Sequence, residues 1–81
     1  MMDEKLMRLI EINPKVMVGK PVIKGTRIPV ELIVRMVAQG ITETDIIHEY
    51  PRLQPDDVRA ALFYAAWMLE HQDILPLAVS G

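Results

Sequence analysis

The side chains that could act chemically in this sequence are few and widely separated. Two pairs could contribute metal ligands, His48-Glu49 and Glu70-His71, but they fall on different predicted helices and lack a recognised ligand spacing. Ser80 is the only serine and has no positioned base, and the absence of cysteine excludes thiolate metal sites and thiol nucleophiles. We therefore expect no catalytic site, no metal and no cofactor, and a protein that acts by binding.

One segment has glycines that superficially suggest a phosphate-binding loop. Gly19 and Gly25 are six residues apart instead of five, no lysine follows Gly25, and Pro21 interrupts the segment. The sequence therefore does not predict a nucleotide site here.

Cationic side chains are concentrated in the first half of the chain. Residues 1–40 carry seven Lys/Arg and four Asp/Glu, giving +3, whereas residues 41–81 carry two and seven, giving −5. Such a chain can attract an anionic partner to one half and a cationic partner to the other, or it can simply have two solvated surfaces. If DNA is bound, the candidate contacts are the basic residues on or beside the predicted strands and turns: Lys15, Lys20, Lys24 and Arg27. The same lysines could instead keep sheet edges soluble, and a pI of 5.6 argues against strong attraction of the whole protein to DNA.

Length and composition favour a single domain, residues 1–81, that associates with a partner. A chain of 81 residues buries only roughly 60% of the surface that its extended chain exposes, and without cysteine it has no disulfide to compensate. The hydrophobic fraction of 51% is high for so small an interior. The longest apolar run, residues 60–69, is shorter than the roughly 20 residues that cross a bilayer. With no secretory signal at its start, we expect a cytoplasmic protein that does not insert into a membrane.

The N-terminal part, residues 7–28, is expected to form a β arm of two or three short strands. Its β-compatible stretches are separated by turns that contain glycine or proline, and they are Met7–Ile12, Val16–Val18, Val22-Ile23 and Thr26–Ile28. Lys24-Gly25 would supply the tight turn between the last two stretches. Such a ribbon is unstable alone and must pack on another element.

Residues 29–72 are expected to form a core of three helices, over residues 30–39, 43–50 and 55–72. Pro29 and Pro55 suit helix starts, and Gly40 suits the left-handed position after a helix end. Thr42 is expected to cap the second helix, which Pro51 ends. The first two helices and their turn resemble a helix-turn-helix. The second helix, however, carries three carboxylates and no Lys or Arg, so we expect it to repel DNA.

The third predicted helix is apolar almost all round. One face comprises Val58, Ala61, Leu62, Ala65, Ala66 and Leu69, and four further large side chains cover most of the rest. Such a helix must be buried almost all round, and a monomer of this size cannot supply the cover. We therefore predict a homodimer with these core or interface residues: Leu62, Phe63, Ala66, Trp67 and Leu69. The alternative is that the N-terminal arm and the apolar tail, residues 73–81, fold over the second face.

From about Asn13 to Ala65 the chain resembles the family catalogued as domain of unknown function 433. The motifs that carry the resemblance are Asn13-Pro14, Gly19–Ile23, Gly25–Val30, Gly40, Tyr50-Pro51 and the acidic start of an Ala-rich helix at Asp56–Leu62. At Gln54-Pro55 the chain departs from the Thr or Ser cap that such proteins more often have. The resemblance implies a mainly α fold, with a three-helix homeodomain-like helix-turn-helix core and a short N-terminal β-ribbon arm. Proteins of this kind are common in bacteria.

The resemblance also suggests the antitoxin half of a toxin–antitoxin pair, opposite a PIN-like ribonuclease. Our leading hypothesis is an antitoxin-like module whose acidic half or apolar tail binds the partner, the tail contacts being Ile74, Leu75, Leu77 and Val79. The basic arm could bind operator DNA. The alternatives are a DNA-binding transcriptional regulator without a toxin partner, and a structural dimer or adaptor. Arg27 is either a functional residue of the ribbon or a structural clamp on a helix end or a carboxylate, and we favour the clamp.

Overall fold

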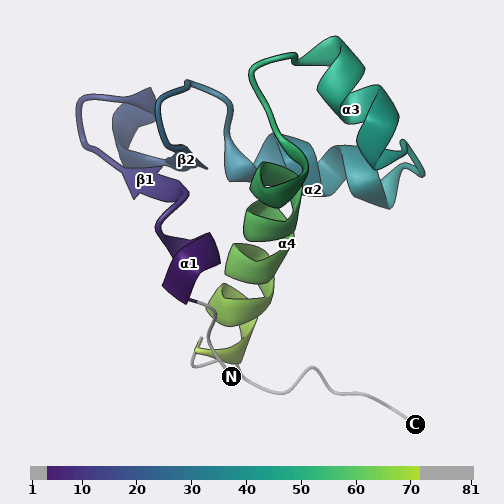
Figure 1. Cartoon of the computed structure of the whole chain (residues 1–81). Coiled ribbons are helices and arrows are strands. Elements are labelled where there is room, and N and C mark those ends of the chain that lie inside the picture. Colours follow the sequence, from purple (N-terminus) through teal and green to yellow (C-terminus); the bar gives the residue numbers. More distant parts are fainter. Residues whose placement is uncertain (1–3, 72–81) are drawn as a thin grey trace, which may run out of the picture.

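The structure, a computed structural model, describes residues 4–71 and is mainly helical (Figure 1). In chain order its elements are α1 (Glu4–Met7), β1 (Ile10–Ile12), the 3₁₀ turn η1 (Met17–Gly19), β2 (Pro21–Ile23), α2 (Val30–Ala38), α3 (Glu43–Glu49) and α4 (Pro55–Glu70). The long helix α4 runs through the middle, with the ribbon and α1 on one side and α2 and α3 on the other. The predicted tail contacts Ile74, Leu75, Leu77 and Val79 lie outside the described residues.

One hydrophobic core joins the three longer helices to the ribbon. Ile33 of α2 and Ile46 of α3 have no exposed surface, and Ile23 of β2 and Leu53 before α4 are almost as deeply buried. From α4, the inward-facing side chains include Val58, Ala61 and Tyr64. Because both strands and all four α-helices contribute at least one side chain to this cluster or pack against it, the ribbon and the helices stabilise one another.

The three predicted helices are confirmed, with ends shifted by one or two residues. Pro29 precedes the first helical residue of α2, and Gly40 follows the helix with a φ of 86°, the left-handed conformation that favours glycine. The hydroxyl of Thr42 accepts a hydrogen bond from the backbone N–H of Asp45 at 3.1 Å, which is the expected cap of α3. Local signals at helix ends were therefore sufficient to place these elements.

The carboxylate of Asp57 closes the first turn of α4. It accepts a hydrogen bond from the backbone N–H of Gln54 at 2.8 Å, and its side chain is buried. Asp56 is the exposed neighbour in the same turn, so both carboxylates meet the positive end of the helix dipole. The Gln54-Pro55 start of the helix, which lacks the Thr or Ser cap more often found in such proteins, is thus stabilised by the carboxylate at position 57.

We expect Asp57→Ala to lower the free energy of unfolding by about 1 kcal/mol, because it leaves the N–H of Gln54 without its acceptor. Asp56→Ala removes a carboxylate with a similar dipole interaction, and its effect should stay below about 0.5 kcal/mol. Urea denaturation of both variants measures the difference. Equal losses of unfolding free energy in the two variants would show that the hydrogen bond of Asp57 adds nothing to the interaction of its charge with the helix dipole.

The β arm differs from its prediction in three stretches. β1 pairs with β2 antiparallel, with Ile10 opposite Ile23, but the expected strand at 16–18 is wrong. Met17 and Val18 instead have φ values of 51° and 55°, because the chain must reverse between two three-residue strands. The expected strand at 26–28 is also wrong. The Thr26 hydroxyl forms hydrogen bonds with the backbone of Ile23 and Ile28, and the only β-bridge that links this part of the chain to β2, among the described residues, is the isolated one between Val22 and Pro29.

The third difference is at the start of the arm, where Met7 ends the short helix α1 instead of beginning a strand. This helix packs along α4 (Figure 1), and Met7 and Ile10 lie against the core. The N-terminal arm therefore covers part of the second face of α4, which is one half of the alternative to a dimer. Among residues 4–71, no helix combines the length and the apolar character needed to span a membrane.

Candidate binding surfaces

From its middle to its C-terminal end, α4 presents apolar side chains that the described chain leaves uncovered. Leu62 is 38% exposed and Leu69 is 63% exposed, and Ala66 between them is exposed as well. The spacing of four and three residues places these side chains on one helix face. We call Leu62, Ala66 and Leu69 the apolar stripe. Of the five predicted interface residues, these three lie at the surface.

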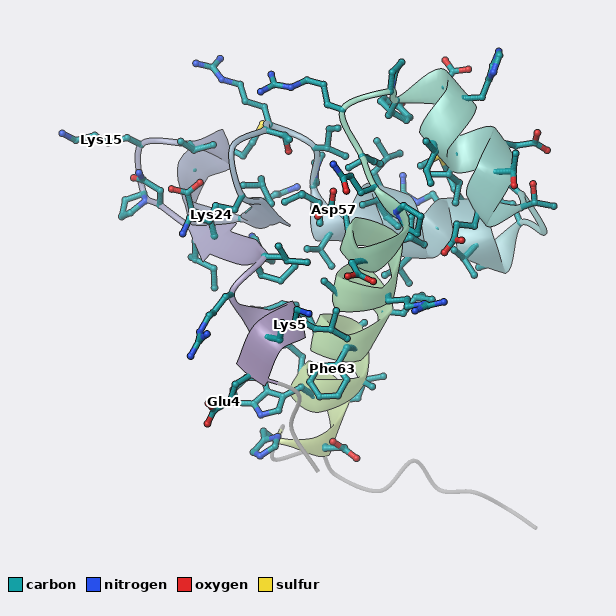
Figure 2. All side chains as sticks on the ribbon, in the orientation of Figure 1. Glu4, Lys5, Lys15, Lys24, Asp57 and Phe63 are labelled. Carbon is teal, nitrogen blue, oxygen red and sulfur yellow. The ribbon has the colours of Figure 1, made fainter. Side chains whose placement is uncertain are left out.

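The other two predicted interface residues are partly used inside the chain. Phe63 is half-buried on the side of α4 that carries α1 (Figure 2). Trp67 is also half-buried, and its ring stacks on His71 with a centroid distance of 4.4 Å. The indole Nε1 of Trp67 is buried and has no hydrogen-bond partner. Trp67 also stacks on Tyr64 of the core with a centroid distance of 6.3 Å, so these two aromatic side chains are only partly available at the surface.

A second apolar surface lies between α2 and α4. It is a groove of about 350 Å³, lined chiefly by Pro21, Val30, Val34, Ala38, Tyr64, Ala65 and Met68. Glu31 and Arg35 of α2 also line it and are exposed. The groove contains no cluster of reactive groups, so its chemistry is that of apolar contact.

Three of the four predicted DNA contacts are exposed and form no ion pair with any described residue. Lys15 and Lys24 lie on the ribbon side of the molecule (Figure 2), and Arg27 follows the turn after β2. The ion pairs of residues 4–71 are Lys20–Glu31, Arg35–Glu31 and Arg59–Asp56, and none involves these three side chains. Exposed, uncompensated cations of this kind are available to an anionic partner.

Lys20 differs, because Glu31 of α2 already neutralises it. Its Nζ donates a hydrogen bond to Glu31 Oε1 at 2.8 Å. This hydrogen bond and the charge of Lys20 lower the pKa of Glu31 below its ordinary value of 4.5, and Arg35 adds a smaller effect in the same direction. Lys20 therefore tethers the ribbon to α2 and is a weaker candidate for an external anion than the sequence indicated.

We expect Lys20→Gln to raise the pKa of Glu31 back towards 4.5, whereas Arg35→Gln should raise it less. Because the folded pKa is the lower one, any stabilisation from this pair is present above pH 4.5 and is lost as the pH falls through the folded pKa. Both groups are exposed, so salt should weaken the effect. Carboxyl carbon chemical shifts, followed by NMR against pH, measure each pKa. An unchanged pKa in Lys20→Gln would contradict the pairing.

Within residues 4–71 Arg27 does not make the expected clamp contact, and Arg52 holds the turn instead. Arg27 is exposed and makes no hydrogen bond or ion pair within the described part of the chain. Arg52 Nη2 instead donates a hydrogen bond to the carbonyl oxygen of Gly25 at 2.8 Å. The two guanidinium groups line one hollow of about 460 Å³ with Glu11, Val16, Gly25 and Thr26. No sequence pattern indicated this pairing, because 27 residues separate Arg52 from Gly25.

The helix α3 exposes its acidic side chains, as its sequence predicts. Glu43, Asp45 and Glu49 are exposed, and Ile46 is the buried residue. The helix lies on the opposite side of the molecule from the ribbon (Figure 1). The acidic side chains of α3 therefore lie away from Lys15 and Lys24 on the ribbon side.

The candidate metal ligands remain separated in the structure. His48-Glu49 belongs to the end of α3, whereas Glu70-His71 belongs to the end of α4. Residues 4–71 contain no group of three or more His, Asp or Glu side chains that could hold a metal ion. Ser80 lies outside the described residues.

The architecture and the sequence both match a known family. The family model described as "Protein of unknown function (DUF433)" matches residues 10–65. The chain belongs to this family. A crystal structure of a family member from Anabaena variabilis at 2.00 Å resolution superposes with a TM-score of 0.73 at 34% identity, covering 83% of this chain and 66% of that one. The DUF433 fold is thus shared over most of the described residues.

Two sequence relatives are themselves described only as uncharacterised proteins. Protein y4eO of Sinorhizobium fredii is 32% identical over 57 residues, which are 70% of this chain and 26% of the relative. A protein of Archaeoglobus fulgidus is 63% identical over 30 residues, 37% of this chain and 83% of the relative. The match thus spans about a quarter of the Sinorhizobium protein. The rest of that protein's sequence has no counterpart in the match to this DUF433 chain.

Proposed function

We propose that this DUF433 protein is a non-enzymatic binding module of the antitoxin type, which associates with other protein chains. The observation that carries the proposal is the apolar stripe on α4, where Leu62 and Leu69 remain 38% and 63% exposed. Contiguous apolar surface on a small protein marks an interaction site.

The stripe suits a second copy of the same chain, so the proposed assembly is a homodimer. In an antiparallel pairing of two α4 helices, Leu62 of one copy would lie near Leu69 of the other, with Ala66 at the twofold axis. Arg59 and Glu70 lie at the two ends of this face, and both are exposed. Antiparallel pairing would bring each arginine towards the opposite glutamate, so charge as well as apolar contact favours self-association.

The proposed antitoxin partner is a PIN-like ribonuclease, as resemblance to the family implies. The acidic side of the molecule, which includes α3, supports contact with a cationic protein surface. The tail residues Ile74, Leu75, Leu77 and Val79 remain proposed partner contacts. We further propose that α2, α3 and α4 form a homeodomain-like core and that the protein is cytoplasmic.

A tagged pull-down from native cells, treated with nuclease, tests the antitoxin proposal. The expected result is a stoichiometric small protein with the clustered carboxylates of a metal-dependent nuclease, identified by mass spectrometry. Recovery of the bait alone would overturn the proposal of a toxin partner.

The second candidate function is DNA binding through the ribbon. It is favoured by the exposed side chains of Lys15, Lys24 and Arg27, which take part in no ion pair within residues 4–71. Lys15 and Lys24 lie on the side of the molecule away from α3, so a duplex that contacts them approaches without meeting the acidic helix. A protein with this function alone is a DNA-binding regulator without a toxin partner.

A further inference from the structure

We propose that the hollow between the Gly25–Arg27 turn and Arg52 holds a phosphate group of duplex DNA. The inference deepens the second candidate function, because it rests on DNA binding by the ribbon side. It also assigns a role to Arg52, which lies between α3 and α4 and is far from the ribbon in sequence. Arg27 and Arg52 both line this hollow of about 460 Å³.

The two arginines are prepared for an anion in different ways. Arg27 is exposed and has no hydrogen-bond partner among residues 4–71, so its guanidinium donors are free. Arg52 is held in place by the 2.8 Å hydrogen bond from Nη2 to Gly25, which still leaves other N–H donors of its guanidinium. One fixed and one free guanidinium on a single hollow form a partly preorganised anion site.

The turn that carries Arg27 is both rigid and open. The Thr26 hydroxyl donates to the carbonyl oxygen of Ile23 at 2.7 Å and accepts from the N–H of Ile28 at 3.0 Å. Gly25 has a φ of 80°, and a Cβ at this position would meet no atom within 4 Å. The backbone is therefore fixed by Thr26 while the space beside Gly25 stays clear for a ligand.

The charge of the hollow suits a phosphodiester, which carries one negative charge. Its lining includes two arginines and one carboxylate, that of Glu11. Beyond the hollow, Lys15 and Lys24 on the ribbon side add cations that no ion pair neutralises. A row of such cations follows a chain of phosphates better than it fits a single isolated anion.

Duplex DNA is favoured over an acidic peptide by the donors present. The planar guanidinium group matches phosphate geometry and can bind two oxygens at once. A peptide ligand would also need apolar or backbone partners, whereas this lining has one apolar side chain, Val16. Phosphate contacts of this kind position a duplex without reading its sequence.

The test is binding of the full-length protein to a fluorescent duplex of mixed sequence, measured by anisotropy at several salt concentrations. We expect Arg27→Gln to weaken binding about 5- to 10-fold and to reduce the slope of log affinity against log salt by about one. Arg52→Lys keeps the charge but loses the planar fork, and we expect it to weaken binding at least about 3-fold. The matched control Arg35→Gln removes an exposed arginine of α2, and we expect wild-type binding within about twofold.

Three outcomes would overturn the proposal. If the wild type binds DNA and Arg27→Gln binds with the same affinity and salt slope, the hollow is not a phosphate site, although DNA binding stands. If the wild type does not bind the duplex, both the hollow and the second candidate function fail. If an acidic peptide of equal charge competes as well as unlabelled duplex, the site does not select phosphate. Thermal unfolding should be unchanged in Arg27→Gln, because Arg27 has no partner among the described residues to lose.

Discussion

Replacing Leu69 by glutamate is expected to convert a dimer of this DUF433 protein to monomers without unfolding either chain. Leu69 is 63% exposed in the single chain, so the new carboxylate remains in water when the monomer folds. In the proposed dimer the same carboxylate would be buried against the apolar stripe of the second copy, which costs at least about 2 kcal/mol. This penalty corresponds to self-association weakened about 30-fold or more. Light scattering across a concentration series measures the change in mass.

The matched control for Leu69→Glu is Ile12→Glu. Ile12 is 57% exposed on β1, so the substitution introduces the same charge at an apolar side chain of similar exposure. We expect the control to keep the wild-type mass. Equal dissociation in both variants would show that added negative charge, and not loss of the stripe, separates the chains.

Replacing Ile33 by alanine is expected to destabilise the fold itself by about 3 kcal/mol. Ile33 has no exposed surface and lies in the cluster where α2 meets α4, so the substitution leaves a cavity. A small domain has only about 5–15 kcal/mol of stability, and the variant should therefore melt well below the wild type. Urea denaturation followed by far-ultraviolet circular dichroism measures the loss.

Ile12→Ala removes the same atoms from an exposed isoleucine. We expect a change of less than about 0.5 kcal/mol, because Ile12 is 57% exposed on the ribbon. A comparable loss in both variants would mean that the ribbon, and not the contact between α2 and α4, limits stability.

The helical part of the fold could be predicted because its signals are local. Gly40 and Thr42 mark the end of one helix and the start of the next through their own backbone and hydroxyl chemistry. The arm could not be predicted in the same way. Val16–Val18 is apolar and β-branched in part, yet its conformation is set by the reversal between β1 and β2, which no single residue signals.

The face of α4 shows a similar limit. Helical spacing groups Val58 and Ala61 with Leu62 and Leu69, but the structure buries the first two and exposes the others. Spacing indicates which residues are neighbours on a helix, whereas burial depends on which neighbouring element lies over each turn. The arrangement of α2 and α1 around α4 supplies that information.

The candidate binding residues were predicted by type but not by environment. Composition identified the basic arm, and Lys15, Lys24 and Arg27 are indeed exposed. The Lys20–Glu31 pair joins side chains that are 11 positions apart in the sequence. The contact of Arg52 with Gly25 spans 27 positions. Such contacts follow from tertiary packing, so a linear pattern of charges could not distinguish free cations from paired ones.

The most direct test of protein association through the apolar stripe is photo-crosslinking with a benzophenone amino acid at position 69, with position 12 as the matched site. The proposed interface predicts an adduct of twice the 9.2 kDa chain mass from position 69, with the crosslink mapped to α4 of the second copy. Position 12 should give none, although both side chains are similarly exposed in the single chain. No adduct from position 69, or equal adducts from both positions, would contradict the stripe as a protein interface.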